Sequence, residues 1–117
     1  MAEWTPELVK LEIYTPCAAL EGLLEALAQA GAGVVGRYTH VCSYAQVEGT
    51  WTPLPGASPY DGKAGEMSRG TEYKLEVRCS AQAVPEALAA VRANHPPYEQ
   101  PVVNILPLYN GMWGEEL

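Results

Sequence analysis

The sequence predicts an α+β fold in which a strand–helix unit occurs twice and a further strand follows each copy. The first observation is a gapless internal repeat, in which residues 10–13 (KLEI) return as residues 74–77 (KLEV). The second is that each copy first alternates apolar and polar residues and then places leucine or valine at helical spacing. These observations predict a four-stranded antiparallel βαββαβ sheet with both helices on one face.

The first unit is a strand followed by a helix. Residues 8–15 alternate with period two, which is typical of a half-buried strand. Thr15 and Pro16 are residue types favoured at the N-cap and first position of a helix, so we expect the helix to begin there. Gly31 is a natural end for it.

The second unit repeats this pattern. Residues 73–79 form its strand, and Ser80 can begin its helix. Pro85 is tolerated only in a first helical turn. The helix positions align as well: Leu20, Leu24 and Leu27 of the first unit match Val84, Leu88 and Val91 of the second.

The remaining strands lie between and after the two units. Residues 34–44 are expected to form a long strand, with a turn at 48–50 that makes a hairpin projecting beyond the sheet. Prolines and glycines exclude a regular strand across residues 53–62, which leaves a long loop. Residues 102–106 are the last core strand, ended by Pro107.

Length and charge limit the class of protein. The 117 residues form one domain (1–117), with a core at 8–108 and short extensions. The net charge of −7 argues against nucleic acid and anionic membranes as partners. The three widely spaced cysteines and a start without the features of a signal peptide lead us to expect a cytoplasmic protein.

The sheet face without helices needs another cover. We expect it to present tyrosine, valine and leucine side chains together with unpaired strand edges. Water, a ligand or a second subunit could cover this face. We therefore expect a homo-oligomer in which the hairpin around residues 48–52 pairs across subunits.

Candidate metal ligands fall in three parts of the chain. His40 and Cys42 lie two residues apart, Glu66 closes the central segment, and His95 and Glu99 follow the second helix. Together they could hold a divalent ion such as zinc or copper, which takes three or four such ligands. The alternative is that His40 and Cys42 are packing residues, and no close-spaced ligand pair favours the metal. No other cofactor is indicated.

Other chemistry has weaker support. The glycines at 31–33 and 56–65 could present backbone N–H groups to an anion, but turn geometry explains the first set more simply. Cys42 with His40 or His95 is the only nucleophile–base pair, and no third residue orients it. We therefore expect no enzyme activity.

Four motifs resemble one known family. They are Gly-Ala-Gly…Gly-x-Tyr-x-His-x-Cys-Ser (31–43), Gly-Thr-x-x-Pro-Leu-x-Gly-Ala-x-Pro (49–59), Gly-x-x-Gly-Glu (62–66) and His-Pro-Pro-Tyr-Glu-x-Pro (95–101). In this order, and over residues 8–108, the chain resembles the insert domain of the NGG-interacting-factor-three-like proteins (the YqfO group). That domain also occurs as a free-standing small protein.

The resemblance implies a ferredoxin-like domain related in shape to PII signalling proteins and to CutA, which assemble as trimers. Larger family members carry this domain inside a second, hydrolase-like domain with two metal ions. The ligands of that domain are not present in these residues, so its activity does not transfer.

We expect a non-catalytic binding or regulatory module, with a ligand or protein partner at a cleft between subunits. His40, Glu66, His95, Tyr98 and Glu99 would come from two chains. Ligand or interface residues would be Tyr38, Gly56, Pro59, Gly65 and Tyr98. The alternatives are a divalent-metal-binding protein and an accessory subunit of a separate metal hydrolase.

Overall fold

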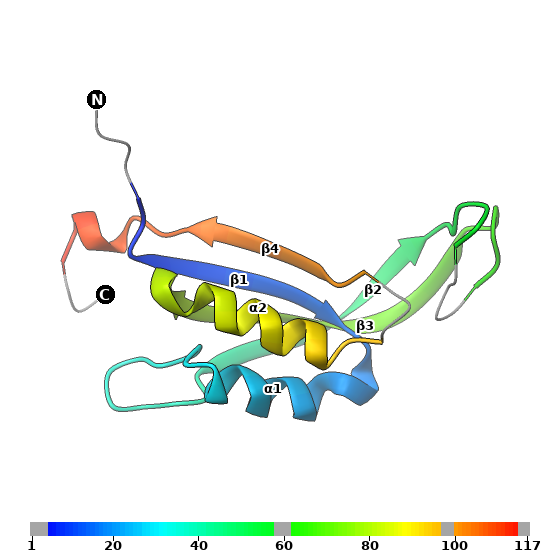
Figure 1. Cartoon of the computed structure of the whole chain (residues 1–117). Helices are drawn as coiled ribbons and strands as arrows, with labels where there is room; N and C mark the ends of the chain where they lie inside the picture. Colours follow the sequence, from blue (N-terminus) through cyan, green and yellow to red (C-terminus); the bar gives the residue numbers. More distant parts are fainter. Residues whose placement is uncertain (1–4, 58–61, 97–99, 115–117) are drawn as a thin grey trace.

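The computed structural model describes residues 5–57, 62–96 and 100–114. Four strands form one antiparallel sheet in the order β2-β3-β1-β4, and the element order is βαββαβ (Figure 1). This confirms the predicted α+β, ferredoxin-like fold. The elements are β1 (Leu8–Thr15), α1 (Leu20–Gln29), β2 (Cys42–Trp51), β3 (Ser68–Ser80), α2 (Val84–Ala93) and β4 (Val102–Pro107).

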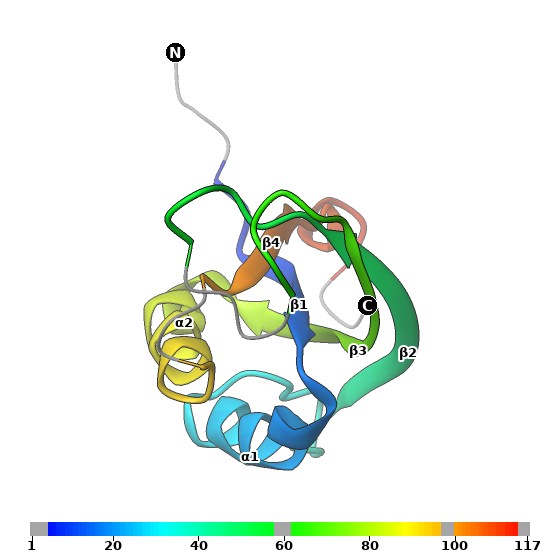
Figure 2. The same ribbon diagram turned by 90° about the vertical axis from the view of Figure 1, so that its right-hand side faces the viewer.

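Both helices lie side by side on the same face of the sheet, as predicted (Figures 1 and 2). Their apolar sides pack on the side chains of β1 and β3 that point toward them, and these residues form a single core. No helix of the described chain is long and apolar enough to cross a membrane.

The sequence repeat is also a structural repeat, and the equivalent elements begin and end at equivalent residues. The 3₁₀ turn Cys17–Ala19 and the helix Leu20–Gln29 return, with the same displacement, as Ala81–Ala83 and Val84–Ala93. Most of the core consists of repeat-related pairs. Buried partners are Leu11 with Leu75, Ile13 with Val77, Thr15 with Cys79, Leu23 with Ala87, and Leu27 with Val91.

The two repeat units meet where β1 pairs with β3. Glu12 lies directly opposite Glu76, its own repeat equivalent, so an approximate two-fold axis passes between them. Like charges in this position repel each other. Each glutamate is compensated diagonally, because Lys10 Nζ lies 3.5 Å from Glu76 Oε1 and Lys74 Nζ lies 3.5 Å from Glu12 Oε2.

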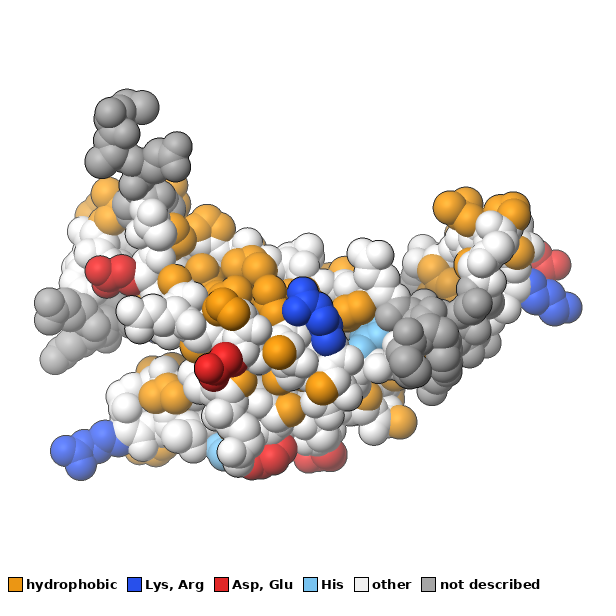
Figure 3. Space-filling model, viewed as in Figure 1, with side chains coloured by type: hydrophobic (Ala, Val, Ile, Leu, Met, Phe, Trp, Pro, Cys, Tyr) orange, Lys and Arg blue, Asp and Glu red, His pale blue; other side chains and the backbone are white. Residues whose placement is uncertain are grey.

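The outward face of the two central strands carries Leu8 and Tyr14, but lysine and glutamate side chains interrupt the predicted row of Tyr, Val and Leu there. Large exposed apolar residues instead lie in the loops, on the edge strands and at the end of the β2–β3 hairpin. Figure 3 shows orange side chains grouped at that far end, where Leu54 and Met67 are 73% and 58% exposed.

A long hairpin of β2 and β3 projects beyond the rest of the sheet, as predicted (Figure 1). The predicted turn at 48–50 was wrong, because these residues continue β2. Gly49 lies opposite Gly70 within the ladder, and the connection runs from Thr52 to Met67. The absence of a side chain at Gly49 leaves room for the Glu72 side chain, because a Cβ at residue 49 would lie only 3.0 Å from Glu72 Oε1.

The predicted strand at 34–44 was wrong over residues 34–41, since β2 begins only at Cys42. Positive φ angles at Gly33, Gly36 and His40 prevent extended pairing in the preceding segment. That segment is a closed loop. The Gly33 N–H donates to the Arg78 carbonyl at 2.8 Å, and the Val41 N–H donates to the Gly33 carbonyl at 2.9 Å.

The helix boundaries confirm most of the predictions. Ser80 caps the second unit, since its Oγ accepts a hydrogen bond from the Ala83 N–H at 3.3 Å. Pro85 stands in the first turn of α2, and Gly31 follows α1 with φ 89°. The predicted cap at Thr15 was wrong: Thr15 is the last residue of β1, and a 3₁₀ turn precedes α1.

We expect Leu75→Ala to lower the free energy of unfolding by about 2–5 kcal/mol, because Leu75 is fully buried where the two units meet. The loss should match that of Leu11→Ala, its repeat equivalent, in urea denaturation followed by circular dichroism. Leu54→Ala is the control, since Leu54 is 73% exposed and should change stability by less than about 0.5 kcal/mol. Equal effects at Leu54 and Leu75 would contradict this packing.

Candidate functional site

The two histidines lie in different pockets, near opposite edges of the sheet. His40 precedes β2 and His95 precedes β4, and these are the two edge strands. Figure 3 shows two separate patches of pale blue histidine atoms. One chain therefore keeps His40 and His95 apart, as the repeat predicted.

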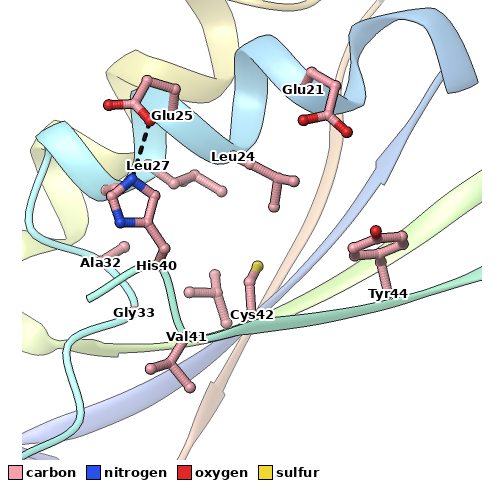
Figure 4. A pocket seen from close by; sticks show the side chains of 12 residues that line it. Glu21, Leu24, Glu25, Leu27, Ala32, Gly33, His40, Val41, Cys42 and Tyr44 are labelled. Atoms are coloured by element: carbon pink, nitrogen blue, oxygen red, sulfur yellow. Dashed lines mark hydrogen bonds and ion pairs between the residues drawn. The ribbon is translucent and has the colours of Figure 1, made fainter. Parts of the chain in front are cut away.

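The first pocket, which we call the α1 pocket, lies between α1 and the loop that leads into β2. Its volume is about 220 Å³. Its polar side chains are Glu21 and Glu25 of α1, together with His40, Cys42 and Tyr44 (Figure 4). The closed loop at residues 33–41 brings His40 over α1, where it meets Glu25.

His40 is held on both ring nitrogens. Its Nε2 lies 3.0 Å from Glu25 Oε2, and its Nδ1 lies 2.9 Å from Thr39 Oγ1. Hydrogen bonds from Gln29 and from His40 lower the pKa of Glu25, together with the charge of His40. This carboxylate and imidazole are both largely exposed, so the pair fastens the loop to α1 without forming a desolvated catalytic centre.

Cys42 points into the α1 pocket between His40 and Tyr44 (Figure 4). Burial raises the pKa of its thiol to about 11. The sulfur is therefore protonated at neutral pH, whereas a nucleophilic cysteine needs a lowered pKa. The predicted pair of His40 and Cys42 thus shares one pocket, and its thiol is not activated.

The second pocket, which we call the hairpin pocket, is the larger one, with a volume of about 340 Å³. It exists because β3 is longer than β1. Residues 68–72, the first part of β3, pair with β2 but lie beyond Thr15, the end of β1, and so have no β1 partner. His95, Pro96 and Gln100, which precede β4, line this vacated side. Tyr14, Thr50, Trp51, Gly70, Glu72, His95, Gln100 and Val102 are among the lining residues.

Glu72 and His95 are the ionisable pair of the hairpin pocket. Burial raises the pKa of Glu72, and the nearby charge of His95 offsets part of that rise. His95 Nδ1 lies 3.1 Å from the Pro96 carbonyl oxygen, which can only accept. Nδ1 therefore carries the proton, and in the neutral ring Nε2 is the acceptor.

The other predicted site residues do not join either pocket. Glu66 lies in the loop at the far end of the hairpin, where Gly65 also lies and donates its N–H to the Pro53 carbonyl at 2.7 Å. Gly56 belongs to the same loop, and Tyr38 is 74% exposed in the turn before β2. Pro59, Tyr98 and Glu99 lie outside the described residues.

No group of three or more His, Cys, Asp or Glu side chains in the described part of the chain could hold a metal ion. The set of His40, Cys42, Glu66 and His95 is not brought together within one chain. A zinc or copper site built from it requires a second subunit, and it stays a prediction.

Sequence reasoning missed Tyr14, Trp51 and Glu72. Each reads as an ordinary strand residue, and only the unequal lengths of β1 and β3 place all three at one pocket. The available signal was the pair Gly49 and Gly70. Two glycines at corresponding places in facing strands indicate room for large neighbouring side chains.

Comparison with known proteins finds relatives of the whole domain. The chain is 43% identical over 104 residues to a GTP cyclohydrolase 1 type 2 homolog of Mycobacterium tuberculosis, covering 87% of this chain and 27% of that protein. The chain is a homologue of one segment of such proteins. It spans less than a third of the length of the curated relatives it matches. No family model matches the chain.

Solved structures agree with this relationship. A Bacillus cereus protein related to NIF3 superposes with a TM-score of 0.78 at 27% identity, over 94% of this chain and 28% of that one. The family resemblance predicted from the motifs is thereby confirmed.

Two smaller proteins share the fold over most of their own length. CutA of Archaeoglobus fulgidus gives a TM-score of 0.64 at 15% identity, covering 87% of this chain and 84% of that one. Bacillus subtilis GlnK gives 0.63 at 18% identity, covering 92% and 93%. They confirm the PII/CutA-like fold.

We expect Cys42 to resist alkylation at neutral pH. A pKa near 11 instead of the ordinary 9.0 leaves the thiolate fraction at about pH 8 roughly a hundredfold lower. Iodoacetamide should therefore modify the exposed Cys17 first, as peptide mass spectrometry can follow. The rate at Cys42 should rise until the pH approaches 11. Two results together would contradict the burial of Cys42: equal alkylation rates for Cys17 and Cys42 at about pH 8 in the folded protein, and no increase in the Cys42 rate when urea unfolds the chain.

Proposed function

We propose that the chain is a non-catalytic, oligomeric binding or regulatory module whose ligand or protein partner binds at the hairpin pocket, close to a subunit boundary. The observation that carries this proposal is the projecting hairpin. It offers a pocket on one side, where β1 stops, and an unpaired strand edge on the other.

The two edges of the sheet differ in how well they are protected. β4 is only six residues long. Pro101 precedes it and Pro107 ends it, and a proline has no backbone N–H to donate to a further strand. β2 is ten residues long and contains neither proline nor lysine. An edge without such residues favours pairing with another strand. This supports assembly through β2, and the family resemblance implies three subunits.

The absence of catalysis is supported by the chemistry of the α1 pocket. Its thiol has a raised pKa, and its carboxylate–imidazole pair is open to water. The pair lies beside Thr39, whose hydroxyl is the only group hydrogen-bonded to His40 besides Glu25 in the described chain. Nothing there lowers the pKa of a nucleophile or shields a reacting atom from water.

A second candidate function is an accessory subunit of a separate metal hydrolase. One observation favours it: relatives carry this segment as 27–28% of a longer chain. A separate protein could supply the remainder. Size-exclusion chromatography of the purified chain with a longer family member from the same organism tests this idea, and separate elution of the two at micromolar concentration would contradict it.

We expect the purified protein to scatter light as an oligomer, with a trimer as the expected mass. The double substitution Gln46→Lys with Glu48→Lys places two lysines on the exposed edge strand and should yield monomers with an unchanged circular dichroism spectrum.

The control is Glu7→Lys with Gln82→Lys, which makes the same change of charge at exposed residues away from β2. It should keep the mass of the parent protein. A parent protein that is already monomeric at micromolar concentration would overturn the assembly. An edge variant that stays oligomeric would place the subunit contact elsewhere.

A further inference from the structure

The hairpin pocket contains features that specify a class of ligand. We infer that it binds a small primary alkylammonium ion, held between the Glu72 carboxylate and the rings of Tyr14 and Trp51. The inference deepens the proposed binding function and rests on it for the site, but the pocket is formed by residues of one chain.

The charge of the pocket favours a cation. Among the described residues that line it, only Tyr14, Glu72 and His95 are ionisable, and none is lysine or arginine. The sequence between Pro96 and Gln100 contains no basic residue either, and the whole chain carries a net charge of −7. A phosphate or carboxylate would meet Glu72 with no lysine or arginine to balance it. A cation would instead be attracted by the Glu72 carboxylate and would meet no lysine or arginine.

Glu72 has no salt bridge or hydrogen bond among the described residues, and the charge of the nearby His95 only partly offsets its burial. By contrast, Glu12 and Glu76 on the same face each pair with a lysine. Its side chain is half-buried and lies over Gly49, where a Cβ would come within 3.0 Å of Oε1. Burial also raises the pKa of this group, which a bound cation would reverse.

The aromatic rings are positioned by the strands. A Cβ at Gly70 would be 2.8 Å from Trp51 Cη2, so the indole lies on the backbone of β3 and needs a glycine there. Tyr14 is opposite Lys74 in the β1–β3 ladder and therefore points to the same face as Glu72. Aromatic rings beside a carboxylate are the surroundings in which proteins hold ammonium groups.

His95 favours an ammonium ion that carries N–H groups. Since Nδ1 donates to the Pro96 carbonyl, Nε2 of the neutral ring is left as an acceptor. A primary ammonium can donate to Glu72 and to His95, while a quaternary one can donate to neither. The volume of about 340 Å³ lies at the small end of ligand pockets, which suits a short alkyl chain.

The test titrates the full chain with butylammonium chloride at constant ionic strength, using calorimetry and the indole N–H resonances. We expect saturable binding that Glu72→Gln weakens by at least about tenfold. The matched control is Glu48→Gln: Glu48 lies on the same hairpin, opposite Thr71, so it points to the other face, and it should bind as the parent does. Tyr14→Leu should weaken binding several-fold, and Tyr14→Phe should retain it.

Three results would overturn the inference. They are the absence of saturable butylammonium binding, equal affinities of the Glu72→Gln and Glu48→Gln variants, and binding of magnesium-ATP or inorganic phosphate in place of the amine. Tetramethylammonium chloride is a further probe, and affinity equal to that of butylammonium would overturn the assignment of a primary ammonium, because a quaternary ion donates to neither Glu72 nor His95. Light scattering on the same samples separates the two proposals: an oligomer that ignores the amine refutes only the ligand, and a monomer that binds it refutes only the assembly.

Discussion

The antiparallel pairing of β1 with β3 is the constraint on which the rest of the structure depends. It joins the two repeat units back to back, so that Leu11 and Ile13 lie diagonally beside their own equivalents, Leu75 and Val77. Leu11 and Leu75 are both fully buried at this contact. The same pairing sets Glu12 against Glu76, and the diagonal lysines make that arrangement tolerable. A shift of one residue would place the leucines in water and the glutamates in the core.

Both pockets follow from the ways in which the strands depart from this two-fold arrangement. β3 is longer than β1, thirteen residues against eight, and the excess forms the hairpin and leaves the inner side of residues 68–72 unpaired. After α1 the chain needs a loop to reach β2, and that loop carries His40 onto Glu25. After α2 it needs another to reach β4, and that loop carries His95 to the hairpin. The core is symmetric, and the candidate sites are not.

The symmetric part of the molecule could be predicted from sequence, whereas for the asymmetric part only the existence of a projecting hairpin was predicted. Period-two and helical spacing, with the KLE repeat, were enough for the fold because burial enforces them locally. The segment from Gly33 to Trp51 was placed wrongly because glycine has two opposite uses. Gly36 adopts a positive φ and turns the chain, whereas Gly49 stays in a strand and makes room for Glu72. Composition alone does not separate these uses, since the deciding neighbour lies far along the sequence.

The repeat also distinguishes residues required by the fold from residues that the fold does not explain. Glu12 and Glu76 are equivalent, and each has an equivalent lysine, so their charges are balanced within the repeat. Glu72 falls at the position that Leu8 occupies in the first unit, just before the matching KLE segments begin. Its half-burial costs free energy, and no described residue offsets that cost by a hydrogen bond or ion pair. No hydrogen bond or ion pair within the described chain accounts for the carboxylate at residue 72, and the proposed cation is assigned to it for that reason.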